Sequence, residues 1–227
     1  FKGRLDTAPL CFEREMIGDD PDADRRDRLF WRLLTHSSCS YRRSIRKNPF
    51  YQDLDSAVIA AHRGCAFCLR HQEVSGPVRK PLSQKRQIER VLRQISAHQA
   101  AEASEECGFE YLFEECELSD DLEVFAAAVL ERNFRPSTFL TLLRADTLLR
   151  KRRELEDLLS GFRSAGHRIG FLSVGAENFS KDENLRLNKG ISPEQLWACY
   201  EMIQDFYKRF PETFSWPEKG IFAAILF

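Results

Sequence analysis

The sequence lacks several features that would place a protein in a class at once. Its 34 basic and 35 acidic residues leave a net charge of −1, so no overall field draws the chain to nucleic acid or to an anionic membrane. No apolar run is long enough to span a bilayer, and the N-terminus has no signal-peptide pattern. These absences favour a cytoplasmic protein.

The seven cysteines do not form a disulfide scaffold, because their number is odd and the chain is neither short nor signal-bearing. In a reducing compartment, a close pair such as Cys65 and Cys68 in "GCAFC" more often indicates metal or redox chemistry. A zinc ribbon would need a second such pair, and there is none. A thioredoxin-like pair normally opens a helix directly, whereas the basic "LRHQ" follows here. The spacing alone is compatible with two interpretations of Cys65 and Cys68, a metal or cluster site and a pair of buried apolar side chains.

The remaining sequence predicts a sizeable core, since 43% of the 227 residues are hydrophobic and 18 are Phe. The first 56 residues are irregular and charged, with a short helix expected over 19–34 and a loop over 38–55. After them, apolar runs and amphipathic stretches alternate. Strands are expected over 57–62, 108–115, 137–145, 167–176 and 220–227, and helices over 83–103, 120–132, 147–166 and 192–210.

This alternation predicts an α/β fold with a parallel sheet, either doubly wound or part of a β/α barrel. In both architectures function lies at the C-terminal ends of the strands. The Cys pair directly follows the expected strand 57–62, so it lies where such chemistry is expected. Ser83 and Ser192 are expected N-caps, and Gly166 is expected to end a helix.

At the Cys pair the sequence resembles the radical SAM superfamily. In that family a C-x3-C-x2-C motif after the first strand holds a 4Fe–4S cluster, and "GCAFC" is similar to its second half, with Phe67 as the aromatic residue before the last Cys. The position of the usual first cysteine is Ala61, which is a departure from the family. Cys39, 26 residues before Cys65, is the best candidate for the third ligand, and Cys11 and Cys116 are the other candidates.

The resemblance implies a specific chemistry. Cys65, Cys68 and Cys39 would hold a 4Fe–4S cluster with one iron left open, because a cubane has four irons. In the family that iron binds S-adenosylmethionine, and an electron from an external one-electron donor then cleaves it to a 5′-deoxyadenosyl radical.

Further stretches resemble the family in the expected order. Glu114 and Glu115 end the second expected strand, 108–115, and are similar to the family's second-strand acidic motif, which binds the methionine amino group. Arg144 ends the next strand, and in the family such an Arg often faces the methionine carboxylate. "IGFLSVGAENFSKDENLRLNKG" resembles the pattern of cobalamin-linked members, in which Glu177 or Asn178 would contact the ribose or the amino group. Ser180 and Asn188 would support that loop.

The implied fold is a partial (β/α)6 TIM-like barrel over residues 57–227, preceded by an extension over 1–56. Because the chain starts with Phe and stops inside "GIFAAILF", we expect it to be a piece of a longer protein with a further strand beyond Phe227. Cobalamin would be carried by a separate upstream domain, in which case methyl transfer is one reaction to expect. The sequence does not identify the substrate.

Two other interpretations stay open. The chain could be a degenerate barrel that acts as a binding module without a redox cluster, or a zinc-binding α/β protein. Binding of nucleic acid is disfavoured, because the arginine-rich stretch 144–157 mixes Arg and Glu at helical spacing, as a solvated helix face does.

Overall fold

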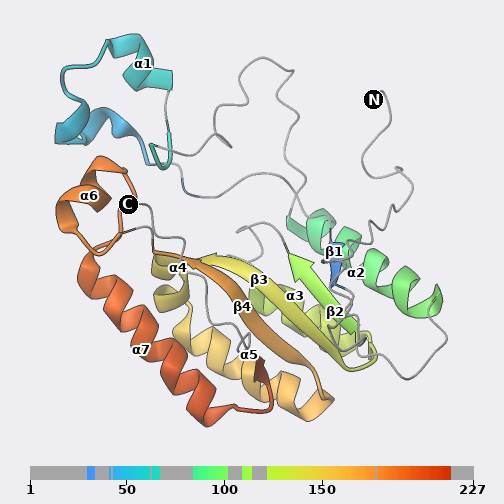
Figure 1. Cartoon of the computed structure of the whole chain (residues 1–227). Coiled ribbons are helices and arrows are strands. Elements are labelled where there is room, and N and C mark those ends of the chain that lie inside the picture. The colour runs from blue at the N-terminus through green and yellow to red at the C-terminus, as the bar shows by residue number, and fades with distance from the viewer. Residues whose placement is uncertain are drawn as a thin grey trace, which may run out of the picture.

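The computed structural model describes residues 30–33, 41, 43–61, 63–66, 84–101, 109–113, 122–176 and 178–215 (Figure 1). Its strands are β1 (Phe30–Leu33), β2 (Phe109–Phe113), β3 (Ser137–Arg144), β4 (Arg168–Gly175) and β5 (Phe214–Ser215). Its α-helices are α1 (Ser56–Ala61), α2 (Gln84–Ala101), α3 (Leu122–Glu131), α4 (Ala145–Arg150), α5 (Arg152–Ala165), α6 (Lys181–Arg186) and α7 (Pro193–Arg209). Two short 3-10 helices, η1 (Ile45–Lys47) and η2 (Pro49–Tyr51), precede α1.

The strands form one sheet in which every pairing is parallel, and their spatial order is the chain order, β1-β2-β3-β4-β5. The expected α/β fold with a parallel sheet is therefore confirmed. A doubly wound sheet of the dinucleotide-binding type reverses its strand order at a switch point, and the five described strands show no such reversal. In the part of the chain that the structure describes, the sheet is open, with β1 and β5 at its edges.

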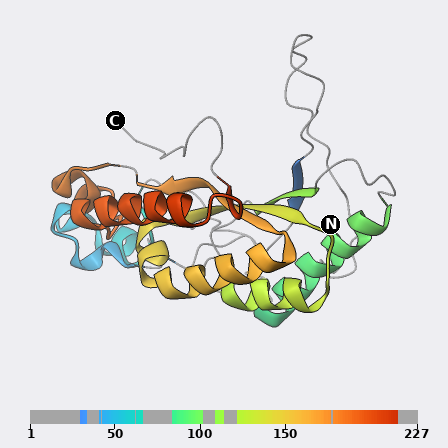
Figure 2. The same ribbon diagram turned by 90° about the horizontal axis from the view of Figure 1, so that it is seen from below.

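The helices α2, α3 and α5 run along one face of the sheet (Figure 2), and together with α4 and α7 they contribute buried residues to its core. Phe139 of β3 is fully buried at its centre. Its ring lies 5.4 Å from that of Phe125 on α3, 5.6 Å from that of Phe162 on α5 and 5.7 Å from that of Tyr111 on β2. These aromatic contacts join two strands and two helices into one hydrophobic core.

The long helices agree with their expected ranges because their sequences carry strong local signals. In α2, Ile88, Val91, Leu92 and Ile95 are all buried at helical spacing. Before α7, Ser192 forms a capping box with Gln195, as expected of an N-cap. The expected helix 147–166 is divided: α4 begins directly after β3, and α5 follows it beyond Lys151. Gly166 ends α5 with φ +71°, a conformation that favours glycine.

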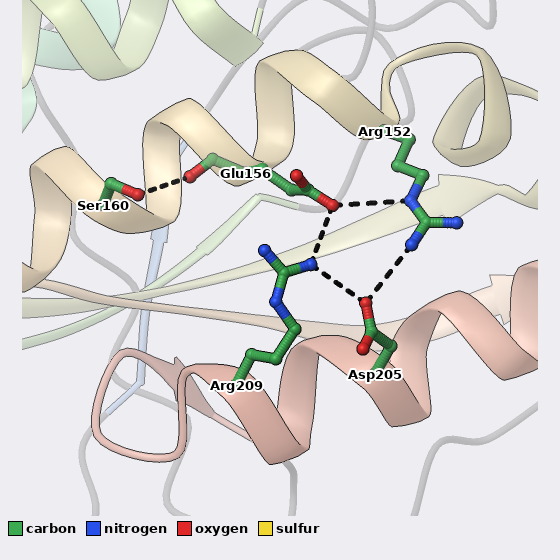
Figure 3. Close-up of polar contacts among 5 residues, drawn as sticks. All are labelled: Arg152, Glu156, Ser160, Asp205 and Arg209. Atoms are coloured by element: carbon green, nitrogen blue, oxygen red, sulfur yellow. Dashed lines mark hydrogen bonds and ion pairs between the residues drawn. The ribbon is translucent and has the colours of Figure 1, made fainter.

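A surface network of charged side chains links α5 to α7 (Figure 3). Glu156 of α5 accepts from Arg209 of α7 at 2.9 Å and from Arg152 at 3.4 Å, and its backbone carbonyl accepts from the Ser160 hydroxyl. Asp205 of α7 accepts from Arg152 at 3.2 Å and from Arg209 at 3.0 Å. Because these pairs are solvent-exposed, each contributes little to the free energy of unfolding.

Two expected elements at the N-terminal side are wrong. Residues 57–62 were expected as a strand, but 56–61 form the helix α1, and Asp55 Oδ1 accepts from the Ala57 N–H at its start. A short apolar run such as "AVIAA" has no periodicity that separates helix from strand. Residues 30–33, expected to end a helix, form β1, because they pair with β2 and this pairing overrides local preference. The remainder of that expected helix, residues 19–29, lies outside the described residues.

The sheet therefore begins inside the segment expected to precede the core, since β1 lies before residue 57. In the sequence Cys39, Cys65 and Cys68 all follow β1 and precede α2. At the other end, β5 was not expected, and the expected strand 220–227 and the expected cap Ser83 lie outside the described residues.

The segment that contains η1, η2 and α1 lies beside α6, at the end of the sheet where β3 and β4 end (Figure 1). Hydrogen bonds hold it there: Asn48 Nδ2 donates to the Leu185 carbonyl at 2.6 Å, and the Tyr51 hydroxyl donates to the Arg186 carbonyl. These hydrogen bonds bring the described residues of this segment (41, 43–61 and 63–66) to the carboxyl edge of the parallel sheet.

Candidate functional site

The candidate site is centred on Arg144, the last residue of β3, a buried residue that is only 5% exposed. Phe139 and Leu143 of the same strand belong to the core between sheet and helices. Side chains alternate along a strand, so Arg144, next to Leu143, projects to the opposite face. A buried guanidinium has to be paired and hydrogen-bonded, and its partners define the site.

The guanidinium of Arg144 contacts four groups. Its Nε donates to Asp146 Oδ1 at 3.0 Å and its Nη2 to Asp146 Oδ2 at 3.3 Å, a two-point ion pair. Nη2 also donates to the Lys189 carbonyl at 2.9 Å. Nη1 lies 3.7 Å from the sulfur of Cys65, within the range of a hydrogen bond to sulfur. The fourth group is the ring of Tyr41, whose centroid lies 3.8 Å from Cζ of Arg144.

The electrostatics of this cluster keep Arg144 charged. Burial by itself would lower the pKa of Arg144, but the Asp146 carboxylate, the Cys65 sulfur and Tyr41 together raise it. Burial raises the pKa of the Tyr41 hydroxyl, and the nearby Arg144 opposes this shift only in part. The Tyr41 hydroxyl is therefore neutral at physiological pH, and it donates a hydrogen bond to the Asn188 carbonyl at 2.7 Å.

Cys65 is buried, and its backbone neighbours hold it on both sides. The Gly64 N–H donates to the Arg43 carbonyl at 2.9 Å, and the Ala66 N–H donates to the Leu187 carbonyl at 2.8 Å. Gly64 has φ +93°, which a residue with a side chain rarely adopts. The glycine before the cysteine thus turns the chain so that Cys65 reaches Arg144.

Asn188 joins the two segments of the site. Its Nδ2 donates to the Gly64 carbonyl at 2.7 Å and to the Arg43 carbonyl at 3.1 Å, and its Oδ1 accepts from Asn48 Nδ2 at 3.2 Å. Its φ of +51° is one that Asn tolerates better than most residues. Asn188 was expected to support the loop around Glu177. Its side-chain hydrogen bonds instead go to the segment that carries Cys65, and through Gly64 it fixes the position of Cys65.

Gly190, two residues further on, is required where the loop meets Tyr41. Its φ is +70°, and a Cβ at this position would collide with the Tyr41 hydroxyl. The short sequence "NKG" therefore supplies three structural functions in the site: the Asn188 side chain, the Lys189 carbonyl and a close approach to Tyr41.

A bulge in the β3–β4 pairing and a polar turn after β4 lie near the same carboxyl edge of the sheet. The pairing of β3 with β4 shifts between Thr141 and Leu142, which re-aims the residues of β4 that follow. Beyond β4, Asn178 accepts from the Ser180 N–H at 2.7 Å through its side chain and from Asn184 Nδ2 at 2.6 Å through its carbonyl. Ser180 caps α6, so this part of the loop is stabilised by its own polar residues.

The structure brings together two of the predicted site residues, Cys65 and Arg144, and places Asn178 in the loop after the neighbouring strand β4. Cys39, Cys68, Glu114, Glu115 and Glu177 lie outside the described residues, as do the alternative ligands Cys11 and Cys116. Among the residues that are described, no three His, Cys, Asp or Glu side chains gather as a metal site.

Sequence reasoning did not find Tyr41, Asp146 or Lys189. The position of Asp146, two residues after Arg144, was the one local signal of a partner for the guanidinium. Tyr41 lies 103 residues from Arg144 in the sequence and carries no motif, so only the folded chain shows the contact.

Comparison of the chain with protein-family models, with curated proteins and with solved structures finds no match. None of the helices in the described ranges is both long and apolar enough to cross a membrane.

Proposed function

We propose that this chain is the core of a radical SAM enzyme, in which Cys65, Cys68 and Cys39 bind a 4Fe–4S cluster that leaves one iron open to S-adenosylmethionine. The cluster would supply one electron, obtained from an external donor, that breaks the C5′–S bond of the sulfonium and yields methionine and a 5′-deoxyadenosyl radical.

The observation that carries the proposal is the place and surroundings of Cys65. Its sulfur lies at the end of β3, at the carboxyl edge of a parallel sheet, where catalytic groups of such folds gather. It also lies 3.7 Å from a buried guanidinium. A neighbouring cation favours the thiolate, which is the form that binds iron. The donor and its surroundings therefore fit a thiolate-bound cluster.

The fold supports the same proposal. A parallel sheet in which neighbours in space are neighbours in sequence, with helices along one face, is the arrangement of a (β/α) barrel. We propose that the complete sheet is the partial (β/α)6 TIM-like barrel of the family. The three cysteines then belong to the connection after the first strand, β1, as the family motif requires.

The remaining residues have proposed roles in binding S-adenosylmethionine. Glu114 and Glu115 directly follow β2, and Glu177 and Asn178 follow β4. Parallel strands end at one edge of their sheet, so these positions are suited to the amino group and the ribose of the cofactor. Asn188 and Gly190 would act indirectly, by holding the chain that carries Cys65.

Anaerobic reconstitution with iron and sulfide tests the proposal. We expect about four irons per chain and an electron paramagnetic resonance (EPR) spectrum that changes when S-adenosylmethionine is added. Cys39→Ala, Cys65→Ala and Cys68→Ala should each lose the cluster. Cys199→Ala is the matched control, because Cys199 is buried in α7 among core residues and should not affect iron content.

The other outcomes are equally informative. Loss of the cluster only in the Cys65 and Cys68 variants would move the third ligand to Cys116 or Cys11. A folded chain that takes up no iron would contradict the proposal. In that case uptake of zinc would favour a zinc-binding protein, and its absence would favour a binding module without a cluster.

A further inference from the structure

We infer that Arg144 acts on the sulfur of Cys65, as a positioning residue that tunes the bound cluster, and does not bind the carboxylate of S-adenosylmethionine. This inference rests on the proposed function and deepens it, because it reassigns the residue that the family resemblance places on the carboxylate.

The guanidinium of Arg144 has no edge left for a carboxylate. An Arg–carboxylate clamp needs two parallel N–H groups on one edge. The edge formed by Nε and Nη2 is occupied by Asp146. On the outer edge, Nη2 donates to the Lys189 carbonyl and Nη1 points to Cys65. Tyr41 covers one face of the group.

The Arg144 side chain is also held in place. It is 7% exposed, and its ion pair with Asp146, its bond to a backbone carbonyl and the Tyr41 ring fix it from three directions. Rotating it toward a new ligand would break the partly buried ion pair and leave the buried guanidinium without its carboxylate partner, which is costly. Nη1 is thus pre-organised toward the sulfur of Cys65.

The expected consequence concerns the reduction potential. Hydrogen bonds to the sulfurs and nearby charge are among the factors that set the potential of an iron–sulfur cluster. Reduction adds negative charge, so a cation next to a ligand sulfur stabilises the reduced form. Because Arg144 is buried, salt and solvent screen this effect little. Arg144 should therefore raise the midpoint potential of the cluster.

The experiment is an EPR-monitored potentiometric titration of reconstituted wild type, Arg144→Gln and Arg144→Lys, together with the affinity of each for S-adenosylmethionine. Arg144→Gln removes the charge and should shift the midpoint potential to a more negative value. Arg144→Lys keeps the charge but loses the planar fork, so it should shift the potential in the same direction by less. The affinity should stay within about threefold of wild type.

Arg132→Gln is the control, because Arg132 is exposed on the surface and pairs with Glu89 of α2, away from the site. Its midpoint potential should equal that of wild type. Circular dichroism checks the fold of each variant, and Arg144→Lys keeps the inference testable if Arg144→Gln does not fold.

Two results would overturn the inference and are distinguishable. An unchanged midpoint potential with an affinity reduced by about tenfold or more, the loss expected for a charge-assisted carboxylate contact, would return Arg144 to the carboxylate and leave the proposed function standing. A wild-type chain that takes up no cluster would overturn both.

Discussion

Replacement of Asn188 tests how the cysteine-bearing segment is held to the sheet. Asn188 is 2% exposed, and its side chain takes part in three hydrogen bonds, two as donor to the Gly64 and Arg43 carbonyls and one as acceptor from Asn48. Each is worth about 0.5–1.5 kcal/mol. Alanine also tolerates the left-handed backbone less well than asparagine, at a cost of about 1 kcal/mol. The sum for Asn188→Ala is about 2.5–5.5 kcal/mol.

The structure offers a matched control in Asn133, which has φ +50°, against +51° for Asn188, but lies exposed after α3. Asn133→Ala should cost only the backbone contribution, about 1 kcal/mol. The difference between the two variants therefore isolates the buried hydrogen bonds. Asn188→Gly loses the same hydrogen bonds, but glycine adopts a positive φ without strain. This variant should therefore be no less stable than Asn188→Ala.

Urea unfolding gives the change in the free energy of unfolding, and hydrogen exchange shows where the loss occurs. We expect amide protection to fall at Gly64 and Ala66, whose N–H groups bond to the Arg43 and Leu187 carbonyls, more than in the core strands. Equal stability of Asn188→Ala and Asn133→Ala, with unchanged exchange at Gly64 and Ala66, would refute the reasoning.

Three further predictions follow from single side chains. Gly190→Ala should destabilise the loop, since its Cβ would collide with the Tyr41 hydroxyl and its φ is +70°; a melting temperature equal to wild type would contradict this. Burial lowers the pKa of His167, whose Nδ1 accepts from the Ser137 N–H, so the unfolded state binds more protons. The free energy of unfolding should then fall as pH drops below about 6.5, and His167→Gln should weaken that dependence in urea titrations at several pH values; an equally steep dependence in this variant would argue against it. Burial raises the pKa of Cys199 to about 12, so the native thiol should resist alkylation at neutral pH and react after unfolding, as site-resolved mass spectrometry would show; rapid native modification would be inconsistent with the packing of α7.

The fold was predictable where sequence signals extend over many residues. The helices α2, α3 and α7 and the strands β2, β3 and β4 match their expected positions, because buried residues recur along them or apolar runs are long. The errors fall on short segments. The four residues of β1 take their conformation from pairing with β2, and the six residues of α1 lie in an apolar run without periodicity.

The site was predictable as a set of residues and not as an arrangement. Cys65 and Arg144 were each selected for a separate role, one as a cluster ligand and the other as a carboxylate contact. Their contact depends on Gly64, on Asn188 and on the ring of Tyr41, which lie far apart in the sequence. Local patterns do not carry such long-range contacts, so the partners of Arg144 could be identified only in the folded chain.

The most direct test of the central claim is the EPR spectrum of the reconstituted, reduced chain, measured before and after addition of S-adenosylmethionine, for wild type and Cys65→Ala. We predict a 4Fe–4S signal that changes on addition of S-adenosylmethionine in wild type and is absent in Cys65→Ala. A signal of equal intensity in the two proteins, or a folded wild-type chain without any signal, would contradict it.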